Sequence, residues 1–290
     1  MPSSRDIRRR IRSISSTAQI TRAMQMVAAS KMRRAQQEAL TTRPFGQLLY
    51  RIQRRAITRA PDFTHPLLTV REVRKRAVVI VGTDKGLCGS LNTNLFRAVT
   101  ALPPVDTVYI AIGKRAAQFV ARMRGQLIAE FSITDSPRYA EARPIAAFVR
   151  DLFLKEEVDQ VLIAATRFVN TLKQQPVVLD FLPIGEIKNL KIPGAESEAE
   201  LAADTSEALF EPNAKTVLTY LLGHYLNIVV YRVLLEAKAS EQSARMVAMT
   251  NATDAATELI QDLRLEYNKL RQGNITKELL EIAGGQLGNS

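Results

Sequence analysis

The chain has 290 residues, of which 46% are hydrophobic, and it carries a formal net charge of +11 at pH 7. This size allows one or two domains with a substantial core. A single cysteine, Cys88, excludes an internal disulfide and fits a reducing compartment. No continuous apolar run approaches the 18 or more residues that span a bilayer, and the N-terminus lacks the apolar segment of a secretory signal.

The positive charge is concentrated in the first 60 residues. They contain 14 Lys and Arg but only two acids, Asp6 and Glu38, so the other 230 residues sum to −1. Such a basic block predicts an acidic partner, namely phosphates, anionic lipid or a carboxylate-rich protein, and the alternative is a solvated helix face. The same segment is rich in Arg and Ser, as a mitochondrial transit peptide is, but we interpret it as the start of a functional helix.

Residues 3–58 contain one proline, Pro44, and favour a long helix. Small and apolar residues alternate at steps of four and three, a heptad pattern that predicts a left-handed coiled coil. They are Ile7, Ile11, Ile14, Ala18, Thr21, Gln25, Ala28, Met32, Ala35 and Ala39. Because they are small or polar after Ile14, we expect close but weakly hydrophobic pairing, supported by a partner.

The middle of the chain predicts an α/β domain over residues 70–205. Short apolar runs indicate strands at 77–82, 107–112, 160–165 and 176–184, and helical patterns occupy 90–100, 114–124 and 144–154. Alternating strands and helices of these lengths favour a mainly parallel sheet. Residues 185–205 are rich in Gly, Pro, Glu, Ala and Ser, and we predict a mobile loop there.

From Asn213 to the end the chain has no proline and predicts one helix. Together with the residues that lead into it, this helix forms the third segment, 206–290. Its expected buried stripe is Leu218, Leu222, Tyr225, Val229, Val233, Ala237, Ser240, Ala244 and Val247, continued by Ala255, Leu259, Leu263 and Leu270. About 70 helical residues would span on the order of 100 Å, so this helix needs a long partner. The segment at 1–60 is the candidate. We therefore predict an antiparallel two-helix coiled coil with an inserted α/β domain.

Gly82–Ser90, with the sequence GTDKGLCGS, is the most enzyme-like segment. It follows a strand and precedes a helix, where backbone N–H groups can bind a phosphate. However, it matches neither common phosphate-binding motif, so we favour a tight turn. Cys88 has no histidine near it in sequence and is interpreted as a packed residue rather than a nucleophile.

Other polar side chains also favour structural interpretations. Two isolated histidines, His65 and His224, and one cysteine give no zinc-ligand spacing. Asp254, Glu258 and Asp262 recur every four residues, and we interpret them as a solvated or partner-facing stripe. We therefore predict no catalytic residue, no metal site and no cofactor.

Nucleic-acid binding is an alternative because Lys and Arg suffice for phosphate contacts. Against it, residues 1–44 contain no aromatic side chain that could stack on bases, and no helix-turn-helix or zinc module is recognisable.

Four long stretches and one tripeptide resemble the gamma subunit of F-type, or rotary, ATP synthases. They are ITRAMQMVAASKMRRAQ at 20–36, GTDKGLCGSLNTNLF at 82–96, FEP at 210–212, SEQSARMVAM at 240–249 and NATDAATELIQDLRLEYNKLRQGNITKELLEI at 251–282. They cover about half of the chain, in the same order as in that family, whereas residues 120–205 show little resemblance.

The resemblance implies a non-catalytic rotor of the central stalk. In this family the paired terminal helices sit inside a ring of three alpha and three beta subunits. The α/β domain contacts the epsilon subunit and the membrane c ring. Ion-driven rotation of the c ring then changes the conformation of the catalytic beta subunits. The resemblance also implies a peripheral location on the cytoplasmic face of the bacterial plasma membrane, held by partners only, while other subunits determine whether protons or sodium ions drive rotation.

The resemblance also suggests contact residues. Arg271 and Gln272 stand at the motif where family members hold loops of one beta subunit. Met24 and the basic residues around it, Arg22, Lys31, Arg33 and Arg34, are expected beside acidic beta-subunit loops. Gly273 replaces the family's usual alanine, which costs about 1 kcal/mol of helix propensity. A nucleotide-binding α/β enzyme remains a third hypothesis.

Overall fold

The computed structural model describes residues 3–41, 62–184 and 213–287, together with residues 48, 52, 55, 56, 59, 60 and 211. Within these ranges the side chains of residues 39, 277–278 and 281–287 are not described. The chain divides into two compact units. We call residues 1–28 with 245–290 the paired-helix unit, and residues 29–244 the α/β unit.

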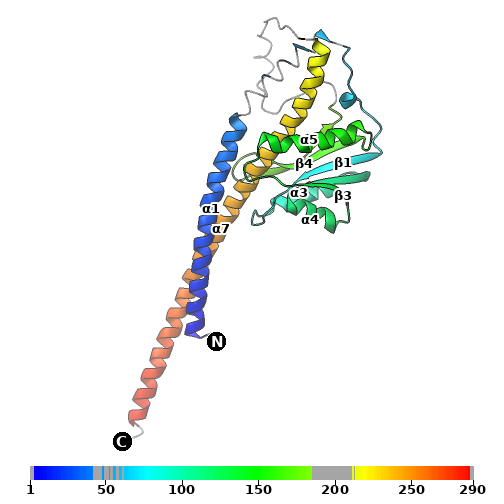
Figure 1. Cartoon of the computed structure of the whole chain (residues 1–290). Helices are drawn as coiled ribbons and strands as arrows, with labels where there is room; N and C mark the ends of the chain where they lie inside the picture. The colour runs from blue at the N-terminus through cyan, green and yellow to red at the C-terminus, as the bar shows by residue number, and fades with distance from the viewer. Residues whose placement is uncertain are drawn as a thin grey trace. The chain divides into compact units, whose positions relative to one another are not determined.

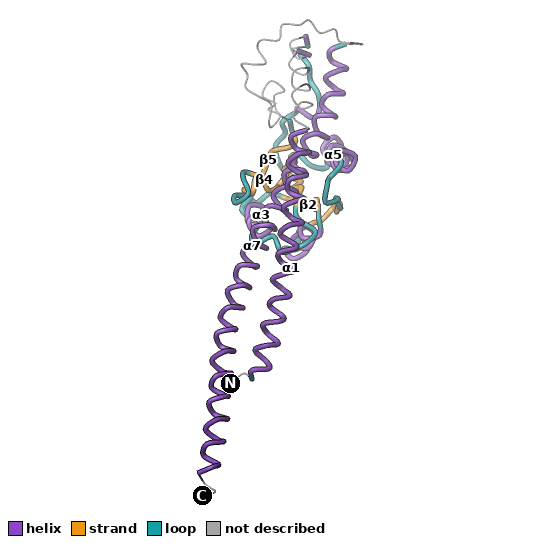
Figure 2. The backbone as a smooth tube through the Cα atoms, turned by 90° about the vertical axis from the view of Figure 1, so that its left-hand side faces the viewer, coloured by secondary structure: helices purple, strands orange, loops and turns teal. Residues whose placement is uncertain are grey.

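Two long helices contribute to both units: α1 (Ser4–Thr41) and α7 (Ala214–Leu287). In the paired-helix unit they lie side by side (Figures 1 and 2). The hydroxyls of Thr21 and Thr253 are 2.7 Å apart, and Arg8 donates a hydrogen bond to the Tyr267 hydroxyl while its guanidinium lies 5.3 Å from the ring centroid. Because residue numbers fall along α1 as they rise along α7, the two helices are antiparallel.

The heptad predicted for α1 is its buried face. Ile7 and Ala28, each 1% exposed, are buried, as are Met32 and Ala35. The five predicted positions between Ile7 and Ala28 are half-buried. Small side chains such as Ala28 allow helices to approach closely, and the pairing of Thr21 with Thr253 shows that part of this face is polar.

The stripe predicted for α7 is correct in its first part, whereas in its second part Leu263 and Leu270 are correct and the other two residues are wrong. From Leu218 to Val247 every predicted position is buried or half-buried, whereas Ala255 and Leu259 are exposed. The seam of the paired-helix unit is Met249, Thr253, Ala256, Ile260, Leu263, Tyr267 and Leu270. These positions alternate by four and three, which is the 3.5-residue repeat of a coiled coil. A stripe extended at a different average period drifts onto the neighbouring positions.

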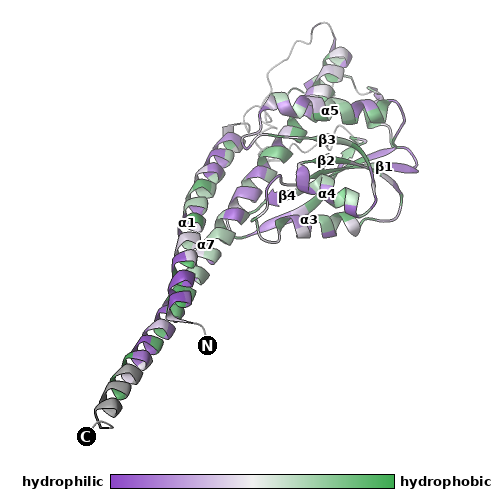
Figure 3. Ribbon diagram, turned by 60° about the horizontal axis from the view of Figure 1, so that its bottom comes forward, coloured by the Kyte–Doolittle hydropathy of each residue, from purple (hydrophilic) through white to green (hydrophobic). Residues whose placement is uncertain are grey.

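A five-stranded sheet forms the centre of the α/β unit (Figure 3). The strands are β1 (Lys75–Val81), β2 (Asp106–Ile112), β3 (Gln126–Phe131), β4 (Gln160–Phe168) and β5 (Gln174–Leu182), in the order β3-β2-β1-β4-β5. The first four are parallel and β5 runs antiparallel to β4. The predicted mainly parallel sheet is confirmed, although the sequence pattern did not predict β3.

Helices cover both faces of the sheet. On one face Val78 and Ile80 pack with α3 (Leu91–Thr100) and α4 (Lys114–Arg122). On the other, Val79 and Val81 pack with α5 (Tyr139–Leu154) and with the middle of α7. Successive strand residues point to opposite faces, so the continuous apolar run of β1 serves both layers. The short 3-10 helix η1 (Pro66–Leu68) precedes the first strand.

The apolar part of α7 is a core helix. By length and composition alone α7 could cross a membrane, with a window of mean hydropathy 1.3. However, Leu222, Leu226, Val230 and Leu234 are each at most 3% exposed and belong to the same cluster as the sheet. Packing on the sheet therefore accounts for this hydrophobic stretch.

Helix α5 begins at Tyr139, not at Pro144 as predicted. The Glu141 carboxylate accepts hydrogen bonds from the backbone N–H of Arg138 at 2.7 Å and of Thr134 at 3.0 Å, which starts the helix one turn earlier. Pro144 lies inside the helix rather than in its first turn. The predictions at Pro44, at 185–205 and at Phe210–Pro212 fall largely outside the described residues.

Candidate functional site

The Gly82–Ser90 loop leaves the carboxyl end of β1, where the chain moves to β2 on one side and β4 on the other. Open α/β sheets often bind ligands at such a point. Here the loop makes hydrogen bonds within itself and to α3. The Thr83 hydroxyl donates to the Lys85 carbonyl at 2.8 Å, and the Asn92 amide donates to Thr83 Oγ1 at 2.8 Å and to Cys88 Sγ at 3.4 Å. Cys88 is buried, which fits its interpretation as a packed residue.

The nearby start of α4 already has an anionic partner. The Asp84 carboxylate accepts a hydrogen bond from the Lys114 N–H at 3.0 Å, the first residue of that helix. This carboxylate occupies the place that a phosphate would take at the N-terminus of α4, whereas the helix that follows the loop in the sequence is α3. The geometry therefore favours a tight turn, the interpretation that the sequence favoured.

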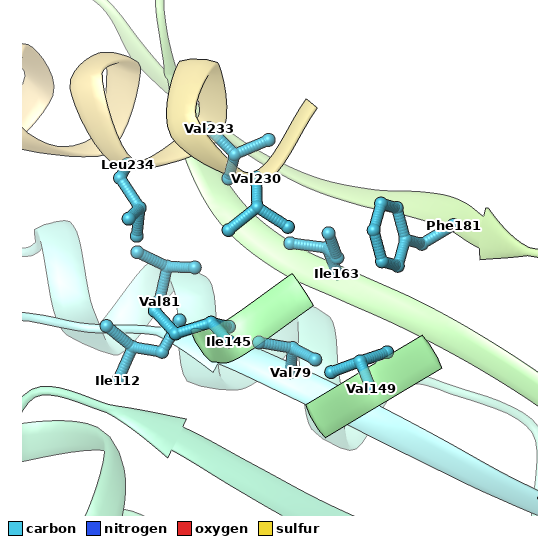
Figure 4. Close-up of a pocket in the computed structure, with 10 residues that line it drawn as sticks. All are labelled: Val79, Val81, Ile112, Ile145, Val149, Ile163, Phe181, Val230, Val233 and Leu234. Carbon is cyan, nitrogen blue, oxygen red and sulfur yellow. The ribbon is translucent and has the colours of Figure 1, made fainter. Parts of the chain in front are cut away.

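The histidines and the internal cavity also have structural explanations. His65 Nδ1 accepts a hydrogen bond from the Leu67 N–H at 3.2 Å, and burial lowers its pKa. His224 is exposed. Among the described residues, no group of three or more His, Cys, Asp or Glu could hold a metal ion. A cavity of about 10 Å³ between the sheet, α5 and α7 has ten apolar lining residues (Figure 4), so it is too small for a cofactor and offers a water no hydrogen-bond partner.

The residues predicted to bind partners divide between the two units. Arg22, Met24, Arg271 and Gln272 belong to the paired-helix unit, and Lys31, Arg33 and Arg34 to the α/β unit. Arg271 and Gln272 are exposed. Neither is involved in burying the seam, so both side chains are available to a partner.

Arg22 and Arg33 are exposed, and neither forms an ion pair with any residue in the described part of the chain. Met24 is half-buried beside the seam. These three side chains are therefore placed where a partner could meet the outer surface of α1.

Lys31 and Arg34, by contrast, have carboxylate partners within the chain. Lys31 Nζ lies 2.5 Å from Asp135 Oδ2, and Arg34 Nε lies 3.1 Å from Glu38 Oε1. The hydrogen bond from Lys31 lowers the pKa of the Asp135 carboxyl, more than burial raises it. The pairing with Asp135 joins residues 104 positions apart, so no local sequence signal could have predicted it.

Buried polar residues lie where α7 meets the β4–β5 hairpin. Lys238 Nζ lies 3.1 Å from Glu241 Oε2, with side chains 3% and 4% exposed. The Ser240 hydroxyl donates to the Thr166 carbonyl at 3.1 Å, and the Ser243 hydroxyl donates to that of Thr171 at 2.7 Å. In the sequence, the signal for this contact is a run of polar residues, SEQS, on the stripe otherwise expected to be apolar.

Comparison with known proteins agrees with this architecture. A family model described as ATP synthase matches residues 3–287. The chain is 44% identical to the ATP synthase gamma chain of Opitutus terrae, with 99% of this chain and 98% of that protein covered. It is also 44% identical to the ATP synthase gamma chain of Methylacidiphilum infernorum, with 99% of each chain covered.

Solved structures share the fold. A chain of the central stalk and c-ring structure of the Tetrahymena thermophila mitochondrial ATP synthase is similar with a TM-score of 0.60 and 25% identity, covering 80% of this chain and 99% of that chain. A chain of the OSCP, F1 and c-ring structure of the Euglena gracilis enzyme has a TM-score of 0.66 at 20% identity, covering 98% and 94%. The comparisons give no support to the nucleic-acid-binding alternative. The chain belongs to the ATP synthase gamma-chain family.

Proposed function

We propose that this chain is the central-stalk rotor of an F-type ATP synthase, which couples ion-driven rotation of a membrane c ring to conformational change at catalytic beta subunits. The observation that carries the proposal is the antiparallel pairing of α1 and α7, helices from opposite ends of the chain, around an inserted α/β domain. Helix α7 belongs both to the sheet's core and to the paired helices, so one continuous helix can transmit torque from one to the other.

The proposed partners are three alpha and three beta subunits around the two long helices, and the epsilon subunit and c ring at the inserted α/β domain. The chain would then be a peripheral protein of the cytoplasmic face of the bacterial plasma membrane, held there by its partners. Its role is non-catalytic. In support, the loop at Gly82–Ser90 is held by its own side chains and by Asn92, and Asp84 already accepts from the start of α4.

The proposed contact residues lie on the two long helices, and all of them are exposed except Met24 and Lys31, which are half-buried. Arg271 and Gln272 would hold a loop of one beta subunit, and Met24, Arg22 and Arg33 would face acidic loops. Lys31 and Arg34 would do so by leaving Asp135 and Glu38. A guanidinium offers up to five donors in a rigid fork, which suits a carboxylate.

Rotation would act by changing which beta subunit receives these contacts. A surface that binds one conformer better than another shifts the population toward that conformer, by as much as the difference in binding free energy. An asymmetric rotor therefore favours a different conformer at each beta subunit as it turns.

The test is co-purification and reconstitution. The full chain, expressed with the alpha and beta subunits of its own enzyme, should form a stable complex, and adding the membrane sector should give ATP-driven ion pumping. Failure to assemble with alpha and beta, together with salt-dependent binding to DNA, would instead favour the basic coiled-coil alternative.

A further inference from the structure

Asp135 holds a basic residue that the proposed function assigns to a partner. It lies in the loop between β3 and α5, and its Oδ2 is 2.5 Å from Lys31 Nζ on α1. The hydrogen bond from Lys31 and the positive charges of Lys31, Lys238 and Lys85 hold the pKa of Asp135 below its ordinary value. Asp135 is thus ionised at neutral pH and surrounded by lysines from α1, α7 and the Gly82–Ser90 loop.

The exposure of this pair makes it exchangeable. The Lys31 and Asp135 side chains are 40% and 47% exposed, so water can solvate both ions when they separate. The nearby pair of Lys238 and Glu241 differs, because its side chains are 3% and 4% exposed and separation would leave buried charges. Of these two pairs, only the one formed by Lys31 can be given up to an external carboxylate at small cost.

We propose that Asp135 is a positioning residue that competes with an acidic loop of a neighbouring subunit for Lys31. The proposal rests on the function proposed above, in which the basic residues of α1 turn past acidic loops of the beta subunits. At one rotor angle Lys31 pairs with Asp135, and at another it pairs with the partner's carboxylate. Since the external carboxylate must first displace Asp135, the contact is weaker than Lys31 alone would make it, and it releases more readily.

The experiment removes the competing charge within the assembled enzyme. Asp135→Asn is placed in the complex of this chain with its alpha and beta subunits, and the rate at which the chain dissociates is measured over a range of salt concentrations. We expect dissociation at low salt to slow about two- to five-fold, the range of one partly exposed ion pair, and the difference to disappear at high salt. Asp135→Glu, which keeps a carboxylate, should behave like the unaltered chain.

Two controls separate competition from a general effect of charge. Asp151→Asn makes the same charge change in an ion pair with Arg150 whose side chains are 51% and 40% exposed, and it should leave dissociation unchanged. In a chain that already carries Lys31→Gln, adding Asp135→Asn should not slow dissociation, because the ammonium group for which the two carboxylates compete is gone.

The outcomes are distinguishable. If the unaltered chain binds the alpha and beta subunits but Asp135→Asn behaves like Asp151→Asn, or if the slowing persists in the Lys31→Gln background, the competition is refuted while the rotor function stands. If the unaltered chain does not bind alpha and beta at all, the proposed function is overturned, and this inference with it.

Discussion

Two glycines allow the close packing at the carboxyl edge of the sheet. Gly113 has φ +89, a region that side chains rarely adopt, and a Cβ there would lie 2.9 Å from the Gly82 carbonyl oxygen. A Cβ on Gly82 would in turn lie 3.0 Å from that of Ala116. Gly82, the first of the three glycines in the enzyme-like loop, is thus explained by strand and helix packing, without a phosphate.

Gly113→Ala should lower the free energy of unfolding by roughly 1–3 kcal/mol, because it combines backbone strain with a steric overlap against the backbone. Urea denaturation followed by circular dichroism measures the change. Gly223→Ala is the matched control, since nothing lies within 4 Å of its added Cβ, and it should raise stability by roughly 0.5–1 kcal/mol. Equal effects of the two substitutions would contradict this explanation.

Cys88→Ser tests whether the buried thiol is only a packing residue. Asn92 donates to Cys88 Sγ at 3.4 Å, and a serine hydroxyl can accept the same hydrogen bond. We expect ATP-driven pumping by the assembled enzyme to remain near that of the unaltered chain. A large loss of pumping with assembly intact would show that the thiol does more than pack.

At the scale of elements, the sequence predicted best where burial repeats regularly. The α1 seam is correct from Ile7 to Ala35 because a heptad leaves a regular trace of small residues. β3 was missed because this edge strand has no fully buried residue, so its pattern resembles a loop. The start of α5 was misplaced because Pro144 was treated as a first-turn residue, whereas Glu141 determines the start.

Candidate contact residues could be identified from the sequence only where a motif marked them, as with Arg271 and Gln272. Their exposure agrees with that role. The sequence could not predict that Lys31 already has an ion-pair partner within the chain, because Asp135 is far away in sequence and comes from a segment without a recognisable motif. Charge counting locates a basic block but does not show which of its members already have partners.

Lys238→Met tests the buried ion pair within α7, on the part of the helix that meets the β4–β5 hairpin. It removes the cation 3.1 Å from Glu241 in a region where both side chains are nearly inaccessible, so we expect a loss of about 3–5 kcal/mol of unfolding free energy. Chemical denaturation of the full chain measures it. Adding Glu241→Leu should recover much of the loss, since a buried pair replaced by apolar groups is often neutral. A double substitution as unstable as the single one would show that the cost lies in packing.

At the scale of the whole molecule, the chain separates its tasks along its two long helices. The middle of α7 belongs to the sheet's core, with Leu226 and Leu234 nearly inaccessible, whereas near its C-terminal end Leu279 and Leu280 are 61% and 67% exposed. Apolar side chains left exposed on a long helix are expected where partner subunits cover them. In the proposed rotor, the end of α7 is therefore a part that contacts the alpha and beta subunits.

Arg271 and Gln272 provide the sharpest test of that division. Both are exposed on α7, so replacing them removes no core contact and should leave the helix intact. A charge-assisted hydrogen bond from Arg271 to a partner carboxylate would contribute roughly 1.5–3 kcal/mol, enough to favour one rotor angle and still allow release. If both side chains were merely solvated, their contribution would be well under 1 kcal/mol.

We therefore expect Arg271→Ala with Gln272→Ala to reduce ATP-driven ion pumping several-fold in the assembled enzyme, while the circular dichroism of the isolated chain stays unchanged. The matched control is Gln261→Ala with Arg264→Ala, an exposed pair of the same residue types on the same helix, which should pump normally. Undiminished pumping by the first variant would reject its role in coupling. Lost helicity would instead show that the two side chains make a contact needed for folding, because merely solvated side chains would not change the stability of α7. Equal losses from both pairs would indicate that the partner subunits respond to the overall charge of the helix rather than to these two side chains.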